Sequence, residues 1–256
     1  MHSFVQSFTG FFSASKFIRK NRLYYFYIIP FLVSLVSYYF LFQFTQEYTQ
    51  IGMDWLMQKW GIDSFLGTHA DDWWGKVLNW IKGFFKVSLT IGVFFISMII
   101  VKYILLALLS PWFAYISEKT EKIKAGTEYN TGLLQILSDA WRGVLISIRN
   151  MVYELSINLF CLILGIFVPF LSPILFGVNL YAGFYFYGFS MMDYVSERKR
   201  MNVKESIRYI RKNKKTAIGI GLGMWLLNFI PVFGLTYASV NGAVAAALSL
   251  TASETN

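Results

Sequence analysis

Sulfur and imidazole side chains are almost absent from this sequence. The chain of 256 residues has one cysteine, Cys161, and two histidines, His2 and His69. A single cysteine cannot form an internal disulfide, and neither histidine has a second ligand at helical spacing. We therefore expect no disulfide framework, no metal site and no cofactor, and we expect Cys161 to be a small buried hydrophobic residue.

Charge is also scarce, and this scarcity excludes an ordinary soluble core. Only 14% of the residues are charged, whereas 56% are hydrophobic and 19% are aromatic. A soluble domain carries roughly a quarter charged residues. Because the apolar residues form runs of helical length, the sequence predicts an all-α integral membrane protein, with one membrane domain over residues 1–256.

The charges that remain are mostly positive. The formal net charge is +9, and the lysines and arginines border the apolar runs instead of spreading over a polar face with interleaved aromatic residues. We therefore expect the lipid bilayer and its anionic phospholipid head groups as partners, with about 1 kcal/mol of attraction for each basic residue at the surface. Nucleic acid is not an expected partner.

Two apolar runs are long enough to cross a bilayer. Residues 23–44 contain no charge, and at 1.5 Å per residue they cover a hydrocarbon core of roughly 30 Å. We predict a first transmembrane helix here and a longer second one over 84–125, whose last part extends into the cytoplasm. Lys102 lies inside the second helix, where its stem either reaches an interface or places an inward charge on a solute path.

Residues 1–22 predict an interfacial amphipathic helix before the first span. Phenylalanines recur at helical spacing and basic residues follow them: Phe4, Phe8, Phe11, Phe12, Lys16, Arg19, Lys20 and Arg22. This pattern is typical of a helix lying in the membrane interface. A cleaved signal sequence is the alternative, but the apolar run that follows is too long for a signal core and no small-residue cleavage site follows it.

The second half of the chain contains two hydrophobic blocks, each interrupted by a proline. Pro169 and Pro231 have no amide hydrogen and clash with the preceding helical turn. We therefore predict two proline-broken helical hairpins. Residues 131–192 comprise an amphipathic approach and the first hairpin, residues 193–250 comprise a basic segment and the second hairpin, and residues 251–256 form a tail.

The two blocks also match each other when one is shifted by 62 positions, which lays Asn179 on Asn241. Either an internal repeat or chance similarity among apolar residues explains these matches. The two asparagines either hydrogen-bond neighbouring helices or line a polar path. Asp193, which closes the first block, is predicted to cap its helix or to pair with Arg198 or Arg200.

The depth of the hairpins follows from their lengths. Residues 216–230 would make a helix of roughly 22 Å, which is shorter than the apolar core of a membrane. We therefore expect partial penetration for the second hairpin. The first arm of the other hairpin, residues 151–168, is near the lower limit for spanning, and its depth stays open.

The distribution of charge predicts an orientation. The loop over residues 45–83 contains five acids, three lysines and five tryptophans, which suggests short helices resting on the interface outside the cell. Residues 193–215 carry nine lysines and arginines against three acids. By the positive-inside rule we expect a multi-pass protein of the bacterial inner membrane, with this basic segment and both termini in the cytoplasm.

Five short motifs occur in a characteristic order along the chain. They are Arg22-Leu23 ahead of Ile29-Pro30, Ser110-Pro111-Trp112-Phe113, Asp193-Tyr194, the basic stretch 204–215, and Ile230-Pro231-Val232-Phe233-Gly234. Their order resembles the family that groups bacterial CysZ sulfate permeases with the eukaryotic etoposide-induced protein of the endoplasmic reticulum. The resemblance covers nearly the whole chain except residues 45–83. It implies an all-helical fold with two long helices and two partly inserted hairpins, homodimers or larger homo-oligomers, and sulfate passage that ATP does not drive.

The start of the first span departs from the family pattern. The resemblance implies an anion site here with two consecutive arginines after a glycine, and at those places this chain has Tyr24, Tyr25 and Arg22. The anion-binding candidates are Asn21, Arg22, Leu23, Tyr24 and Tyr25. Helix amides and one guanidinium can still meet an oxyanion, but tyrosine hydroxyls are neutral, so we expect weaker sulfate binding. The alternative is that Arg22 only anchors the span to lipid phosphates.

Two functions therefore compete. The first is CysZ-like transport of sulfate or another small anion, along a path whose candidate residues are Lys102, Pro169, Asn179, Asp193, Pro231 and Asn241. The second is a non-transporting envelope scaffold or interaction protein, favoured by the missing arginine pair. The sequence shows no phosphate-binding loop, no catalytic residues and no Ser-His arrangement, so an enzyme is not expected.

Overall fold

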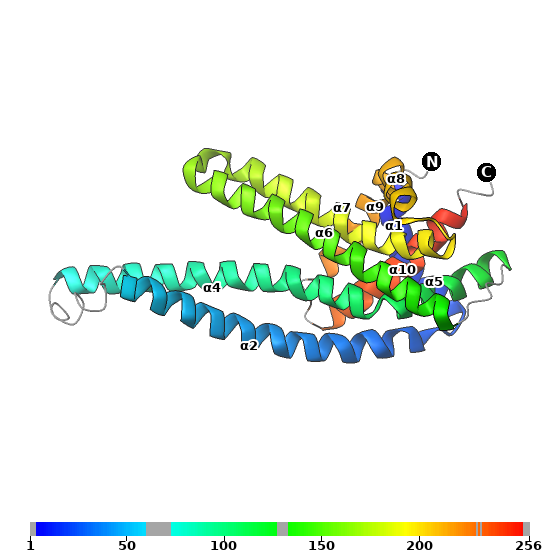
Figure 1. Cartoon of the computed structure of the whole chain (residues 1–256), viewed down its shortest axis with the longest axis horizontal. Helices are drawn as coiled ribbons and strands as arrows, with labels where there is room; N and C mark the ends of the chain where they lie inside the picture. Colours follow the sequence, from blue (N-terminus) through cyan, green and yellow to red (C-terminus); the bar gives the residue numbers. More distant parts are fainter. Residues whose placement is uncertain (1–3, 60–72, 127–132, 229, 231, 253–256) are drawn as a thin grey trace. The chain divides into compact units, whose positions relative to one another are not determined.

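A computed structural model describes residues 4–59, 73–126, 133–228, 230 and 232–252 (Figure 1). Throughout these segments the regular structure is helical, and no strand occurs in them. Five helices are long and apolar enough to cross a membrane. The prediction of an all-α integral membrane protein is therefore confirmed. Pro231, the predicted second break, lies outside the described residues.

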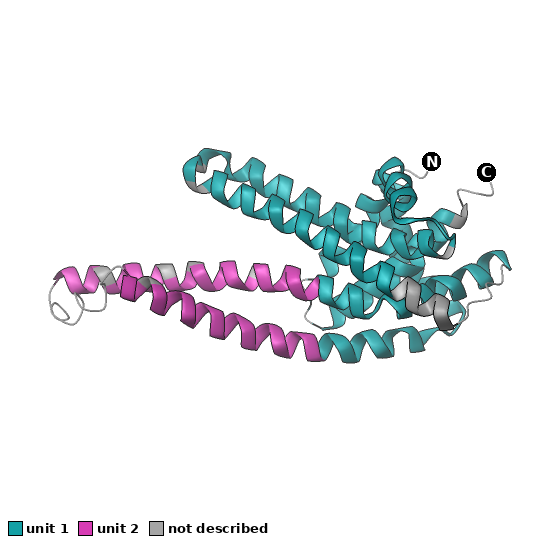
Figure 2. Cartoon of the chain, viewed as in Figure 1, with its two compact units in different colours: residues 1–35, 103–256 teal, residues 36–102 magenta. Residues whose placement is uncertain are grey.

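The chain divides into two compact units, which we treat separately (Figure 2). Unit 1 comprises residues 1–35 and 103–256, and unit 2 comprises residues 36–102. The helices run through the chain as α1 (Phe4–Lys20), η1 (Tyr24–Tyr27), α2 (Ile28–Lys59), α4 (Trp73–Leu108), α5 (Ser110–Ala125), α6 (Leu133–Phe167), η2 (Pro169–Leu171), α7 (Ser172–Arg198), α8 (Val203–Lys212), α9 (Lys214–Leu227) and α10 (Phe233–Ala252).

Unit 2 corrects the predicted loop over residues 45–83. Helix α2 continues to Lys59 and α4 already begins at Trp73, so most of this region belongs to two long helices and not to short interfacial ones. The buried side chains of α2 recur every fourth residue through this region: Leu41, Thr45, Thr49, Met53 and Met57. The buried residues therefore share one face of the helix, as in an amphipathic helix, although two of them are threonines and two are methionines.

The predicted second span is divided near its end. Helix α4 stops at Leu108, and α5 starts at Ser110 with Pro111 in its first turn. Proline is tolerated there because the first amides of a helix have no hydrogen-bond partner within the helix. Helix α5 then ends at Gly126, whose φ of 70° is the left-handed conformation that glycine adopts without strain. The helix therefore ends at the predicted boundary, residue 125.

Helix α10 is the core of unit 1. It contacts α1, α5, α7 and α9, and 78% of its stretch Phe233–Leu250 is buried inside the protein. Its inward residues are small, since Ala238, Gly242 and the run 243–247 are all buried. Small side chains let neighbouring helix backbones approach closely. The most enclosed membrane-type helix is therefore surrounded mainly by protein and not by lipid.

The first hairpin forms where the proline break predicts it. Helices α6 and α7 run side by side (Figure 1), joined by the 3-10 turn Pro169–Leu171. Both helices contain apolar windows long enough to span, whereas α9 has 14 residues, or about 21 Å. Helices α9 and α10 are separate and pack on each other. The short length of α9 keeps partial insertion of the second hairpin as the prediction.

Helix α1 is present as predicted, but its apolar face is divided between two environments. Phe11, Ala14 and Ile18 are buried against α9 and α10, whereas Phe4 and Phe12 are exposed. The ring of Phe11 fills the space beside Gly223. The buried face therefore docks onto the second hairpin, and only the outer aromatic strip remains for a lipid interface.

The α7 and α9 backbones meet at two glycines. A Cβ atom on Gly188 would overlap the carbonyl of Ala217, and a Cβ atom on Gly221 would overlap the carbonyl of Phe184. Helix backbones come this close only where side chains are missing. These two glycines therefore fix how the second hairpin packs on the first.

We expect Gly221→Ala to lower the free energy of unfolding by about 1–3 kcal/mol, because the added methyl group forces the two helices apart. Thermal unfolding of the detergent-solubilised protein measures this loss. Gly177→Ala in α7 is the matched control, since a Cβ atom there meets nothing within 4 Å. Equal melting temperatures for the two variants would contradict the close packing at Gly221.

Candidate functional site

Two polar regions stand out within unit 1. The first is the α1–α2 corner, defined here as residues 21–27 with Trp112, Tyr115 and Asn241. The second is the hairpin polar seam, defined as the buried polar residues between α6 and α7 with their direct partners: Tyr103, Arg142, Asn150, Glu154, Ser190, Asp193, Glu197 and Ser206. The predicted anion-binding residues all lie in the corner, whereas Asp193 lies in the seam.

The corner begins with the end of α1. The Leu23 amide donates to the Ile18 carbonyl at 3.0 Å, and the Arg22 amide donates to the Arg19 carbonyl at 3.2 Å. This is the Schellman pattern of a helix C-terminus, with buried Leu23 and Ile18 as its apolar pair. Asn21 also caps the helix, because its Nδ2 donates to the Phe17 carbonyl at 2.9 Å. Leu23 and Asn21 therefore help to end α1 and shape the corner.

Arg22 occupies the position of this motif that glycine usually fills. Its φ is 56°, a left-handed conformation that costs a residue with a Cβ atom roughly 1–2 kcal/mol. Its side chain is exposed and makes no ion pair within the described segments. Arg200 repeats the arrangement after α7, with the same φ and an amide bonded to the Glu197 carbonyl at 2.9 Å.

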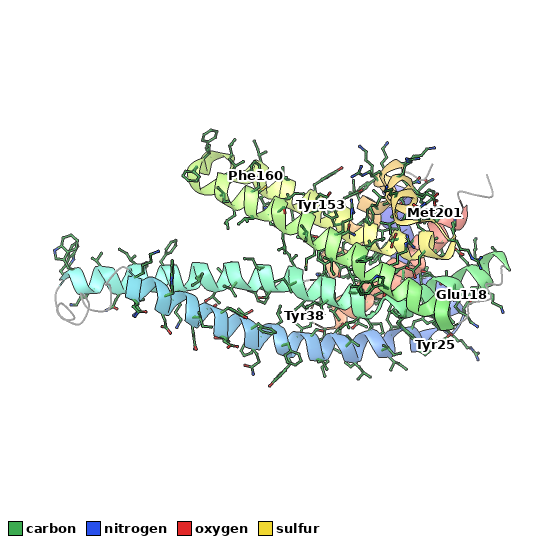
Figure 3. All side chains as sticks on the ribbon, in the orientation of Figure 1. Tyr25, Tyr38, Glu118, Tyr153, Phe160 and Met201 are labelled. Carbon is green, nitrogen blue, oxygen red and sulfur yellow. The ribbon has the colours of Figure 1, made fainter. Side chains whose placement is uncertain are left out.

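Aromatic contacts hold the next turn, η1, against α5. The ring of Phe26 is fully buried, and the indole Nε1 of Trp112 donates to the Phe26 carbonyl at 3.0 Å. The hydroxyl groups of Tyr25, labelled in Figure 3, and Tyr115 lie 3.4 Å apart. Tyr24 is 57% exposed. Tyr25 is 37% exposed, so Tyr24 is the more exposed of the two tyrosines.

Asn241 connects α10 to this corner. Its Nδ2 donates to the Tyr27 hydroxyl at 3.1 Å and to the Tyr237 carbonyl at 2.9 Å. The bond to Tyr27 corresponds to one of the two roles considered for this asparagine, and a place on a polar path stays a prediction. Its Oδ1 is buried and has no hydrogen-bond partner among the described residues, as is also true of the Asn179 Oδ1 in α7.

The hairpin polar seam contains a buried ion pair that joins three helices. The Arg142 guanidinium of α6 donates to Asp193 Oδ1 of α7 at 2.9 Å, and the Ser206 hydroxyl of α8 donates to the same oxygen. Glu197 lies one turn further along α7, at 4.0 Å from Arg142. The side chain of Asp193 is 2% exposed.

The observed partners of Asp193 differ from the predicted Arg200, whereas the side chain of Arg198, the other predicted partner, lies outside the described residues. Arg200 is near Asp193 in sequence but lies in the turn after α7, and its side chain is exposed. Arg142 comes instead from the antiparallel neighbour, a non-local contact that charge order along the chain does not encode. The available signal was that Arg142, Asn150 and Glu154 recur at spacings of eight and four on one helix.

Further along the seam, two more polar contacts cross between helices. Glu154 accepts a hydrogen bond of 2.5 Å from the Tyr103 hydroxyl, and Asn150 Nδ2 donates to the Ser190 hydroxyl at 3.4 Å. Glu154 is 4% exposed, although it lies inside an apolar run. The sequence analysis overlooked this carboxylate. Because lipid offers no hydrogen bonds, such groups must find partners inside the protein.

The remaining candidates are placed as follows. Lys102 is 8% exposed in α4, at the end of unit 2. Both roles considered for Lys102 stay predictions. Pro169 lies in the turn of the first hairpin, away from both polar regions along α6 and α7. Within the described part of the chain, no three possible metal ligands lie close together.

The comparisons with known proteins give one family. A family model described as "Sulfate transporter CysZ/Etoposide-induced protein 2.4" matches residues 10–238. This range includes residues 21–27 of the corner, the seam and the first hairpin, and it ends within α10 of the second hairpin. A comparison with curated proteins found no match.

We expect Arg142→Ala to destabilise the protein by about 3–5 kcal/mol, because it leaves the Asp193 carboxylate buried without its cation. The double variant Arg142→Met with Asp193→Leu should recover most of the loss, since both charges are then removed. Thermal unfolding in detergent provides the measurement. Arg200→Ala, at an exposed arginine, should change stability by no more than about 0.5 kcal/mol. A double variant as unstable as the sum of its single variants would refute the coupling.

Proposed function

Because this chain belongs to the family of sulfate transporter CysZ and etoposide-induced protein 2.4, we propose that it carries sulfate or another small oxyanion across a membrane. The observation that carries the proposal is the family match over residues 10–238, on a multi-pass helical membrane protein. The family description names a transporter and no catalytic activity. The sequence has no phosphate-binding loop, so ATP would not drive the passage.

The α1–α2 corner is the proposed first contact for the anion. Its exposed Arg22 guanidinium lies directly before η1 and α2, where helix amides without helical partners favour negative charge. An arginine also offers two parallel N–H donors to an oxyanion. Charge and donors thus occur together at the start of a membrane helix.

The aromatic residues of the corner set the expected affinity. Tyr24 and Tyr25 present neutral hydroxyl groups where the resemblance implies two arginines, and the Tyr25 hydroxyl is already close to that of Tyr115. A neutral donor contributes less to binding a dianion than a charged one. We therefore infer weak sulfate binding at this site and tolerance of singly charged oxyanions.

The seam and the buried candidates are proposed to serve later steps. Lys102, Asn179, Asn241 and Asp193 are buried or half-buried polar groups on apolar helices, which is costly and usually functional in a membrane. Asp193 is satisfied by Arg142 and Ser206, so its proposed role is to position α7 and α8 and not to contact the anion.

The setting of the protein is proposed from charge and surface composition. The basic segment 193–215 supports an inner-membrane location with both termini in the cytoplasm. Exposed apolar side chains such as Phe160, which is 62% exposed and projects from α6 in Figure 3, are available to lipid or to a second copy of the chain. A homodimer or higher homo-oligomer is therefore proposed.

Uptake of labelled sulfate into proteoliposomes tests the transport proposal. We expect Arg22→Ala to reduce the flux at low sulfate about tenfold or more, as loss of a charge-assisted contact of about 1.5–3 kcal/mol requires. Arg200→Ala is the control, since that arginine has the same left-handed backbone after another helix. Arg22→Gly relieves the backbone strain and also removes the charge. This variant should therefore be more stable than wild type but should transport sulfate as slowly as Arg22→Ala.

If wild-type protein gives no flux above empty vesicles for sulfate and related oxyanions, the transport proposal is wrong. The non-transporting scaffold then explains the missing arginine pair. If Arg200→Ala slows transport as much as Arg22→Ala, the corner has no special role.

A second expectation concerns the tyrosines. Tyr24→Arg should increase sulfate affinity about tenfold, because Tyr24 is exposed beside Arg22 and a second guanidinium adds a charged donor. Equilibrium binding of labelled sulfate to the purified protein measures the change. Tyr24→Met, which removes the hydroxyl without adding charge, should show no gain. An unchanged affinity in Tyr24→Arg would place the anion elsewhere.

A further inference from the structure

Helix α8 is confined near the membrane surface by the chain on both sides of it. The apolar window that precedes it ends at Glu197, and α9, which contains the apolar residues of the second hairpin, begins one residue after α8. The link over residues 199–202 spans at most about 14 Å when fully extended. A helix tied this closely to the candidate span Ser172–Glu197 on one side and to the apolar helix α9 on the other has no freedom to move into bulk water.

One side of α8 is fixed to the protein. Ser206 and Ile210, one helical turn apart, are both fully buried, and the Ser206 hydroxyl donates to Asp193 in the hairpin polar seam. A capping box closes the start of the helix, because Asn202 accepts from the Glu205 amide at 2.9 Å while Glu205 accepts from the Asn202 amide at 2.8 Å. The orientation of α8 about its own axis is thereby set.

The opposite side of α8 is exposed and strongly basic. The exposed basic residues of the helix and its flanks are Arg200, Lys204, Arg208, Arg211, Lys212, Lys214 and Lys215. Glu205 is the one exposed acid of this stretch, and its carboxylate is held in the capping box. The stretch therefore presents seven positive charges against one negative charge that is already engaged.

We propose that this basic face of α8 binds the head groups of anionic phospholipids. The phosphates of such lipids lie at the level where the two flanking apolar helices leave the membrane, and Arg208 and Arg211 can each offer a bidentate donor pair to a phosphate. Nucleic acid and soluble acidic proteins would compete for the same charge. They lack the enforced proximity that chain connectivity gives to lipid.

The partner is chosen by position as well as by charge. A solvated basic surface needs no fixed orientation, whereas α8 is held by a buried serine, a buried isoleucine and a capping box so that its charged side faces away from the protein. The charge-bearing side is thus presented on a rigid support. The binding does not depend on anion transport, so the two proposals can fail separately.

The test measures lipid retention and not flux. The full-length protein is purified in a neutral detergent, incubated with phosphatidylglycerol or phosphatidylcholine, and examined by native mass spectrometry for bound lipid. We expect phosphatidylglycerol to be retained preferentially. The triple variant Arg208→Gln, Arg211→Gln and Lys212→Gln should weaken that retention by about 100-fold, as three surface charges of about 1 kcal/mol each require.

Two matched variants decide the interpretation. A triple variant at Lys119, Lys122 and Lys124 of α5, each changed to Gln, removes the same charge elsewhere and should retain phosphatidylglycerol like wild type. Arg208→Lys with Arg211→Lys keeps the charge and should retain most of the binding. Circular dichroism in detergent should show equal helix content, which separates lost binding from lost folding.

Three outcomes would overturn the proposal. They are equal retention of both lipids by wild-type protein, unchanged retention in the α8 triple variant, and an equal loss in the α5 variant. Competition between an RNA oligonucleotide and phosphatidylglycerol nanodiscs is a further check. If the same face prefers the RNA, the surface belongs to a different partner.

Discussion

Close backbone contact between helices is the constraint on which this structure depends. In lipid, apolar side chains gain little by leaving one hydrocarbon environment for another, so helices associate through tight packing and hydrogen bonds. Gly188 and Gly221 allow α7 and α9 to touch backbone to backbone, and the small residues of α10 let α1, α5, α7 and α9 surround it. Both polar regions take their positions from this arrangement.

The buried polar groups add specificity to that packing. A buried ion pair contributes little net stability, but an unpaired buried charge is costly, so such a pair selects one register of the helices that carry it. Asp193 accepts bonds from Arg142 and Ser206, which lie on two different helices. A helix shifted by one turn would lose both bonds. The seam therefore specifies how the first hairpin and α8 align.

The sequence predicted the features that depend on local backbone chemistry. The turn at Pro169 follows from the missing amide hydrogen of proline, and the structure contains this turn. It could not predict that α2 continues to Lys59, because a run of polar residues looks like a loop until their one-sided burial is known. The partner of Asp193 was missed because it comes from a distant segment. Similarly, nothing local distinguishes the Phe11 side of α1, which packs on protein, from the outer strip.

The docking of α1 onto α9 and α10 has a consequence for biosynthesis. The ribosome makes α1 first and the second hairpin much later, so the buried side of α1 has no protein surface to cover it while the intervening helices are inserted. During translation its phenylalanine side chains must be held by lipid or by the insertion machinery. Assembly of the protein core is therefore a late event, completed when the second hairpin arrives and displaces that temporary cover.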